Sequence, residues 1–287
     1  MKASRFLVVL FALVGLAECM NDGDELQWAR HAYVVKIIAQ LSINNTIACT
    51  GTMISQSLVL TSSRCFDGVR EENLNAVVLL PKVGGTTSNR KVTGLALRGN
   101  TAVISIKKRS FQELCPQAPI PPRVGRLPIE PSLMFSSWKK LDFDNLAITS
   151  CRIIGFRTVM VHEYQDKHIM LYTNVNVTAE DMLTADVMEG RGACWDDIGL
   201  PLECELRKNT WVQVGFLHSL STVDLNTEEK EKGNYLKSEN QSDENDYSCS
   251  NVSRMRFSKL DEAVGDLLNG LHTKEIMSIQ SSCFADY

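Results

Sequence analysis

Cys194, His218 and the neighbouring carboxylates of Asp196 and Asp197 are the residue types that a covalent catalyst needs. A thiolate could act as the nucleophile, an imidazole as its base, and a carboxylate could orient the imidazole. We favour a simpler interpretation of these residues. Cys194 is expected to be half of a disulfide, and His218 a hydrogen-bonded polar residue on a strand.

A second group of residues, His162, Glu163, Asp166 and His168, contains side chains that bind zinc in other proteins. The six-residue spacing of the two histidines fits neither a helical HExxH motif nor a zinc finger. We therefore expect no metal site, and no other motif suggests a cofactor.

A third feature is Arg64, which precedes Cys65 in the stretch LTSSRC, residues 60–65. The residues before it, Met53 to Leu60, are mostly aliphatic and predict a buried strand or hairpin. A guanidinium is costly to bury without a partner, so its place at the end of a core strand requires an explanation.

The 287 residues must supply one or two domains with an ordinary core, since 44% are hydrophobic and 22% are charged. Strand-like runs alternate with turn signals and predict an all-β sandwich or a pair of barrels. The runs are residues 33–43, 75–83, 101–107, 146–156, 170–177 and 211–220. The formal charge of −4 gives no reason to expect nucleic-acid binding, which needs a concentrated basic face.

Three further segments have a recognisable composition. Residues 115–131 hold six of the eight prolines and predict an extended linker. Residues 224–247 are rich in charge and predict a solvated loop, for which a partner-binding role is the alternative. A helical pattern begins at Ser258 and ends near Gly270.

The N-terminus has the layout of a secretory signal, which we place at residues 1–19. Lys2 and Arg5 precede an apolar run from residue 6 to 17, which is short for a membrane span. Cleavage after Ala17 or after Cys19 is compatible with the sequence. The second choice removes the odd cysteine and leaves eight, an even number that predicts disulfides in a secreted chain.

Secretion also fits four glycosylation sequons, and no later segment is long and apolar enough to span a bilayer. We therefore expect an extracellular protein with no membrane span in the mature chain. The predicted sugar-bearing residues are Asn44, Asn176, Asn240 and Asn251.

Three short sequence motifs resemble those of a known protein family. CTGTMISQSLVLTSSRC resembles the chymotrypsin-like serine protease word C-G-G-x-L-I-x-x-x-x-V-L-T-A-A-H-C, and ACWDDIGLPLEC resembles C-x-G-D-S-G-G-P-L-x-C. The segment from Cys249 resembles the family's last strand and terminal helix. The resemblance implies two six-stranded antiparallel β-barrels with a C-terminal helix, over residues 28–273, and a tail at 274–287.

The resemblance implies that all three catalytic positions are changed. Arg64 stands where the family has its histidine, Asn100 where it has its aspartate, and Ile198 where it has its serine. Isoleucine has no lone pair with which to attack a carbonyl, and arginine stays protonated and cannot act as a base. We expect Arg64 to face solvent or a carboxylate such as Asp196 or Asp197.

The resemblance also places changed residues around the triad. Asp196 lies at the oxyanion position, where a carboxylate repels the developing charge. Gly192 lies at the floor of the specificity pocket, and Leu200 replaces a glycine. In the family, Asp197 pairs with a new N-terminus after cleavage behind a basic residue, but the residues after Arg30 do not match that terminus. Asp197 must find another partner or remain in a solvated loop.

The disulfides implied by the resemblance are Cys49–Cys65, Cys151–Cys204 and Cys194–Cys249, and the two remaining cysteines are paired as Cys115–Cys283. The expected function is that of a secreted, non-catalytic serine protease homologue that acts as an extracellular binding or regulatory module. Its partner is expected to be an extracellular protein. The alternative is a divergent trypsin-like serine-type endopeptidase that takes part in proteolysis.

Overall fold

The computed structural model describes two bodies of β-structure and the turns between their strands. The predicted leader, the proline-rich segment 115–131, the part of the predicted helix beyond residue 260 and the predicted tail lie outside the described residues. Within them, no helix is long and apolar enough to cross a membrane. The described residues are 20, 23–26, 31, 33–42, 45–54, 57–69, 75–81, 87–107, 150–162, 165–179, 181–187, 191–207, 210–222, 230–231 and 252–260.

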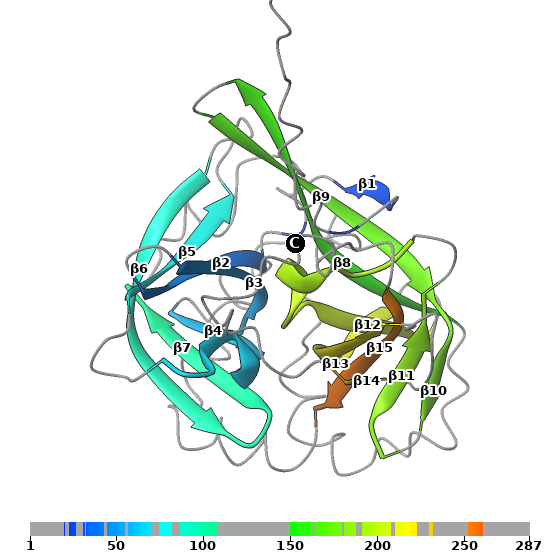
Figure 1. Cartoon of the computed structure of the whole chain (residues 1–287). Helices are drawn as coiled ribbons and strands as arrows, with labels where there is room; N and C mark the ends of the chain where they lie inside the picture. The colour runs from blue at the N-terminus through cyan, green and yellow to red at the C-terminus, as the bar shows by residue number, and fades with distance from the viewer. Residues whose placement is uncertain are drawn as a thin grey trace, which may run out of the picture.

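The first body is a closed antiparallel barrel, drawn in blue and cyan in Figure 1. Its strands follow one another around the barrel in the order β2-β3-β4-β7-β6-β5. Side chains such as Val35, Ile37 and Ile104 are fully buried in its core. The strands are β2 (Val34–Ser42), β3 (Asn45–Met53), β4 (Leu58–Ser62), β5 (Asn75–Pro81), β6 (Thr87–Arg98) and β7 (Thr101–Ile106).

The second body is a nine-stranded sheet in the order β1-β9-β8-β12-β13-β15-β11-β10, with β14 paired to β13. Among the described residues it is an open path rather than a closed six-stranded barrel. Its strands are β1 (Asp24–Leu26), β8 (Cys151–His162), β9 (Gln165–Val175), β10 (Val177–Ala179), β11 (Leu183–Asp186), β12 (Pro201–Arg207), β13 (Thr210–Thr222), β14 (Lys230–Glu231) and β15 (Val252–Lys259).

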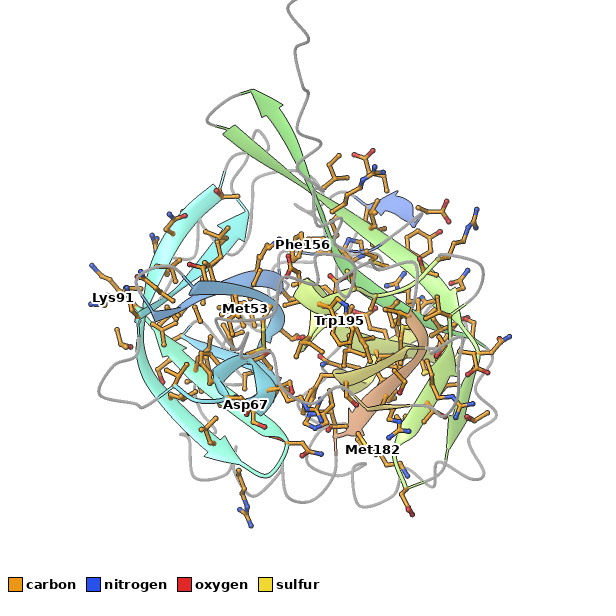
Figure 2. All side chains as sticks on the ribbon, in the orientation of Figure 1. Met53, Asp67, Lys91, Phe156, Met182 and Trp195 are labelled. Atoms are coloured by element: carbon orange, nitrogen blue, oxygen red, sulfur yellow. A yellow bond between two sulfur atoms is a disulfide. The ribbon has the colours of Figure 1, made fainter. Side chains whose placement is uncertain are left out.

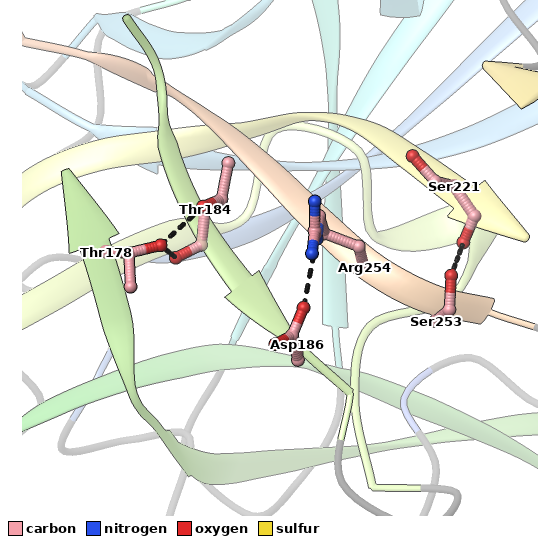
Figure 3. Close-up of polar contacts among 6 residues, drawn as sticks. All are labelled: Thr178, Thr184, Asp186, Ser221, Ser253 and Arg254. Atoms are coloured by element: carbon pink, nitrogen blue, oxygen red, sulfur yellow. Dashed lines mark hydrogen bonds and ion pairs between the residues drawn. The ribbon is translucent and has the colours of Figure 1, made fainter. Parts of the chain in front are cut away.

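Polar side chains join neighbouring strands at the far edge of this sheet (Figure 3). The hydroxyls of Thr178 and Thr184 lie 2.6 Å apart across β10 and β11, and Arg254 on β15 donates to Asp186 at 3.0 Å. Both residues of this ion pair are largely exposed, with side-chain exposures of 41% and 76%. Exposed pairs of this kind contribute little stability, typically about 0–1 kcal/mol.

A buried ionic network joins the N-terminal end of the first barrel to the second sheet. Glu203 is fully buried and accepts a hydrogen bond from the hydroxyl of Tyr33 at 2.7 Å. Arg152 donates to the other carboxylate oxygen through two nitrogens, at 2.8 and 2.9 Å, and its guanidinium lies 4.1 Å from the ring centroid of Trp211. Burial raises the pKa of the Tyr33 hydroxyl, so it remains a donor.

The predicted all-β fold is confirmed, and most predicted strands lie where the sequence placed them. The run between Cys49 and Cys65 forms two paired strands, β3 and β4. The prediction was wrong at Ser258 and Lys259, which end strand β15 instead of beginning a helix. Both lie opposite strand β13 in regular pairing, and this sheet pairing overrides their local helical pattern.

Candidate functional site

A short turn between β11 and β12 forms the centre of the candidate site. It contains a 3₁₀ segment, η4 (Trp195–Asp197), and Figure 2 shows Trp195 between the two bodies. Backbone hydrogen bonds close the turn: Asp197 donates to the carbonyl of Cys194, and Leu200 donates to the carbonyl of Asp197, both at 2.9 Å. The shape of the turn is thus set mainly by the main chain.

Gly199 lets this turn lie directly against the first barrel. Its φ of +88° is in the left-handed region, which glycine adopts without strain. A Cβ atom there would lie 2.0 Å from the Thr61 hydroxyl and 2.2 Å from the Thr50 carbonyl oxygen. The neighbouring Ile198 carbonyl accepts a hydrogen bond from the Thr50 amide at 2.8 Å. No larger residue fits between the turn and strand β3.

The three residues that the resemblance placed at catalytic positions come from segments that the structure brings together. Arg64 lies in the 3₁₀ segment η2 (Ser63–Phe66), and the Ser63 amide donates to the carbonyl of Asn100 at 2.9 Å. The Cys65 sulfur lies 3.6 Å from the carbonyl oxygen of Ile198. The Asn100 residue is exposed, whereas Ile198 is buried, with 1% of its surface accessible.

Asp67 caps the C-terminal end of the same 3₁₀ segment as Arg64, and its amide donates to the carbonyl of Arg64 at 3.3 Å. Arg64 is partly buried, and its charge lowers the pKa of the Asp67 carboxyl, although burial of that carboxyl is the larger effect and raises it. That Arg64 faces solvent or a carboxylate such as Asp196 or Asp197 stays a prediction.

Asp197 is fully buried, so the prediction of a solvated loop was wrong, and the alternative of another partner is the one observed. One carboxylate oxygen accepts hydrogen bonds from the backbone amides of Met20 and Cys194, both at 2.9 Å. The other accepts a longer one, 3.4 Å, from the amide of Phe156. Met20 itself has no exposed surface, so the chain just after the predicted leader lies inside the protein.

Gly155 makes room for this contact. A Cβ atom there would lie 2.7 Å from a carboxylate oxygen of Asp197 and 3.0 Å from the sulfur of Met20. Burial raises the pKa of Asp197 to about 6, while the Cys194 amide and the charge of Lys36 act in the opposite direction. The nearby Asp196 carboxylate adds to the increase. Asp197 is therefore a buried acid that ionises near neutral pH.

Two of the other predicted site residues, Gly192 and Leu200, are also enclosed. Gly192 is buried, and a Cβ atom there would lie 3.0 Å from both terminal methyl groups of Val187, so an aliphatic side chain covers this glycine. Leu200 has no exposed surface. Asp196 is partly exposed beside the turn. Val187 was missed by the sequence reasoning, because no motif marks it.

The side chain of His218 contacts a serine hydroxyl on the first barrel. Its Nδ1 lies 3.0 Å from the Ser62 hydroxyl oxygen, and both residues are buried. Ser62 also accepts a hydrogen bond from the amide of Arg64, at 3.3 Å. Cys194 is in a disulfide and so has no thiol. The interpretation of His218 as a hydrogen-bonded polar residue on a strand agrees with this arrangement.

Two disulfides lie within the described residues, Cys49–Cys65 and Cys151–Cys204, and both pairs match those implied by the resemblance. Cys249, Cys115 and Cys283 lie outside the described residues. Strand pairing places His162 opposite Gln165 and His168 opposite Thr158. The described part of the chain contains no group of three residues that could hold a metal ion.

The comparisons with known proteins agree with this geometry. A family model described as Trypsin matches residues 27–241, and no curated protein matches the chain. A solved structure described as HL collagenase superimposes with a TM-score of 0.54 and 14% identity, over 88% of this chain and 98% of the collagenase chain. At this identity the superposition shows the fold alone. Because the family model covers most of its length, this chain belongs to the trypsin family.

Proposed function

We propose that the protein is a secreted, non-catalytic member of the trypsin family that acts as an extracellular binding or regulatory module. The proposal rests mainly on Ile198, an apolar residue at the position that the resemblance assigns to the nucleophile. Only 1% of its surface is exposed. It has no group that can attack a carbonyl, and a substrate could not reach it without movement of the turn.

Residues around Ile198 support the same proposal. Arg64 cannot accept a proton, Asn100 carries no charge, and the Asp196 carboxylate lies one residue from the buried Asp197. Val187 packs against Gly192, which the family resemblance placed at the floor of the specificity pocket.

A fluorophosphonate probe tests this proposal. Wild-type protein should not be labelled, because Ile198 offers no hydroxyl. The triple variant Arg64→His, Asn100→Asp, Ile198→Ser should be labelled slowly at most, since Asp196 and the buried Leu200 remain. Labelling of the wild type, or rapid turnover of peptide esters by the triple variant, would overturn the proposal.

One contact favours the alternative of a divergent endopeptidase. The Ser62 hydroxyl and the His218 imidazole are 3.0 Å apart, which is the separation expected of a nucleophile and its base. Ser62 has no exposed surface, however, so a polypeptide could not reach it in this arrangement. Cleavage of a peptide library by purified protein that is abolished in Ser62→Ala would establish the alternative.

Secretion is part of the same proposal, through removal of a leader after Ala17 or Cys19. Two disulfides support an oxidising compartment. Asn176 supports glycosylation because it is exposed between strands β9 and β10. Mass spectrometry of the N-terminal peptide from protein secreted by cultured cells identifies the cleavage position, and retention of the protein inside the cells would contradict secretion.

A further inference from the structure

The nitrogen of Met20 lies inside the protein, against the carboxylate of Asp197. It donates to one carboxylate oxygen at 2.9 Å, and both residues have no exposed surface. The sulfur of Met20 and the same carboxylate also lie close to Gly155, where an added Cβ atom would be 3.0 Å from the sulfur and 2.7 Å from an oxygen. Both the backbone and the side chain of Met20 therefore occupy an enclosed, closely fitted site.

The buried carboxylate of Asp197 lacks a full positive charge in hydrogen-bond contact. Its other described donors are the backbone amides of Cys194 and Phe156, at 2.9 and 3.4 Å. Neutral donors reduce the cost of burying a carboxylate but leave its charge uncompensated. Burial is the main reason that the pKa of Asp197 is raised, and two nearby charges act in opposite directions, because Lys36 lowers this pKa and Asp196 raises it. An ammonium group in direct contact would supply the missing charge.

The backbone torsion at Met20 is explained by the same change. Its φ is +40°, in the left-handed region, and no other non-glycine residue in the described part of the chain has a positive φ. This region is strained for a residue that carries a Cβ atom. The torsion is defined by the carbonyl carbon of the preceding residue, Cys19, so a cut between the two residues removes the torsion and its strain.

We propose that the secretory leader is cut after Cys19, and that the ammonium group freed at Met20 is the counter-ion of the buried Asp197 carboxylate. The leader peptidase adds water across the peptide bond, so Cys19 leaves with a carboxylate and the Met20 nitrogen becomes an ammonium. Removal of the leader thereby orders the turn from Cys194 to Leu200, and no second cut further along the chain is needed.

The two cleavage positions that the sequence leaves open differ in their consequences. Cleavage after Cys19 has small residues, Ala17 and Cys19, where leader peptidases prefer them, and it removes the ninth cysteine. Cleavage after Ala17 would leave Glu18 and Cys19 in front of Met20, whose nitrogen would stay an uncharged amide. The contact with Asp197 therefore favours the cut after Cys19.

The N-terminal peptide of the secreted protein tests the cleavage position. It should begin at Met20, and a secreted chain that begins at Glu18 would overturn the proposal. The proposal rests on the secretion part of the proposed function, and the two fail in different ways. Retention inside the cells contradicts secretion, whereas secretion with a longer N-terminus contradicts the pairing of Met20 alone.

A double-mutant cycle tests the pairing itself, on protein refolded with its disulfides formed, so that the result does not depend on secretion. One change places two extra residues before Met20, and the other is Asp197→Asn. Each single change leaves one buried charge without its partner, whereas the double change leaves neither. At neutral pH the double change should raise the unfolding equilibrium constant at least about tenfold less than the product of the two single effects.

Asp186→Asn is the matched control, because Asp186 is an exposed carboxylate of the second sheet and should not couple with the N-terminal extension. Coupling of less than about twofold between the extension and Asp197→Asn would overturn the proposal. Equal coupling for Asp186→Asn would overturn it too, because the effect would then reflect net charge.

A measurement without a side-chain substitution keeps the test independent of whether Asp197→Asn folds. The carboxyl carbon of Asp197 can be followed by nuclear magnetic resonance as the pH is lowered, in the chain that begins at Met20 and in the chain with two extra residues. A contacting ammonium favours the ionised carboxyl, so the titration midpoint should be lower in the first chain by about one pH unit or more. Equal midpoints would show that the Met20 ammonium is not the counter-ion.

Discussion

The ionisation of Asp197 should make the protein less stable as the pH rises through 6. The pKa of this buried carboxyl is about 6, against an ordinary value of 3.8. The folded protein therefore binds the proton more tightly than the unfolded chain does. The stabilisation is fully present below the ordinary pKa and is lost as the pH rises through the folded pKa.

The size of the effect follows from the two values. Each tenfold change in a protonation equilibrium corresponds to about 1.4 kcal/mol, so the shift corresponds to ~3 kcal/mol between the fully protonated and fully ionised forms. About 2 kcal/mol of this should appear between pH 4.5 and 7. This is a large part of the total stability of a typical domain, which is about 5–15 kcal/mol.

The perturbation that isolates this effect is Asp197→Asn, which keeps the shape of the side chain and removes its titration. Unfolding by guanidinium should be followed at several pH values for both proteins, with the disulfides intact. Both should keep at least one residue before Met20, so that the Met20 nitrogen beside Asp197 stays an uncharged amide. The substitution also removes a buried hydrogen-bond acceptor, so the informative quantity is the slope of the unfolding free energy with pH and not its value at one pH.

The wild-type free energy of unfolding should fall with rising pH more steeply than that of the variant, by about 2 kcal/mol over this range. Parallel profiles would refute the reasoning, because they would mean that Asp197 has the same pKa in the folded and unfolded states. If the free energy of unfolding rose with pH more steeply in the wild type than in the variant, Asp197 would be ionised and strongly paired at acidic pH.

Three further predictions concern a glycine, a buried ion pair and a glycosylation sequon. Gly199→Ala should lower the unfolding free energy by more than about 3 kcal/mol, because φ is +88° and two atoms would lie within 2.2 Å of the added Cβ. Gly99→Ala, at φ +54° with open space around it, should lower it by about 1 kcal/mol. Equal costs would contradict the docking of the turn. Glu203→Gln should cost about 3–5 kcal/mol in the same measurement, because it leaves the largely buried Arg152 guanidinium without its carboxylate. Asp186→Asn, in the exposed pair, should cost less than about 1 kcal/mol. Asn176→Gln should abolish one step of the gel-mobility shift produced by peptide N-glycosidase, and an unchanged pattern would show that this sequon carries no sugar.

The strands could be predicted from the sequence because their signals are local. The predicted runs 75–83 and 101–107 alternate or run apolar over the length of a strand, and they form strands at Asn75–Pro81 and Thr101–Ile106. Strand β6 was missed, since its alternation of buried and exposed residues is irregular and it contains Gly94 and several polar residues. Propensity alone does not distinguish such a segment from a loop.

The partners of the buried charges could not be predicted, because they are distant in sequence. Met20 and Asp197 are separated by 177 residues, and Tyr33 and Glu203 by 170. A lysine such as Lys36 within an apolar run suggests an exposed position, and only the packing of the second body on strand β2 buries it. Local pattern determines which face of a strand a residue occupies, but not what covers that face.

The candidate site separates the groups that shape the turn from the groups that would carry out catalysis. The turn depends on main-chain hydrogen bonds, on Gly199 and on the carboxylate of Asp197, none of which requires a serine, a histidine or a second aspartate nearby. The residue that the resemblance places at the nucleophile position can therefore be an isoleucine whose carbonyl is still bonded to Thr50. Substitution of catalytic side chains does not by itself disorder such a turn, and a chain that had lost hydrolysis would still keep an ordered surface for a partner.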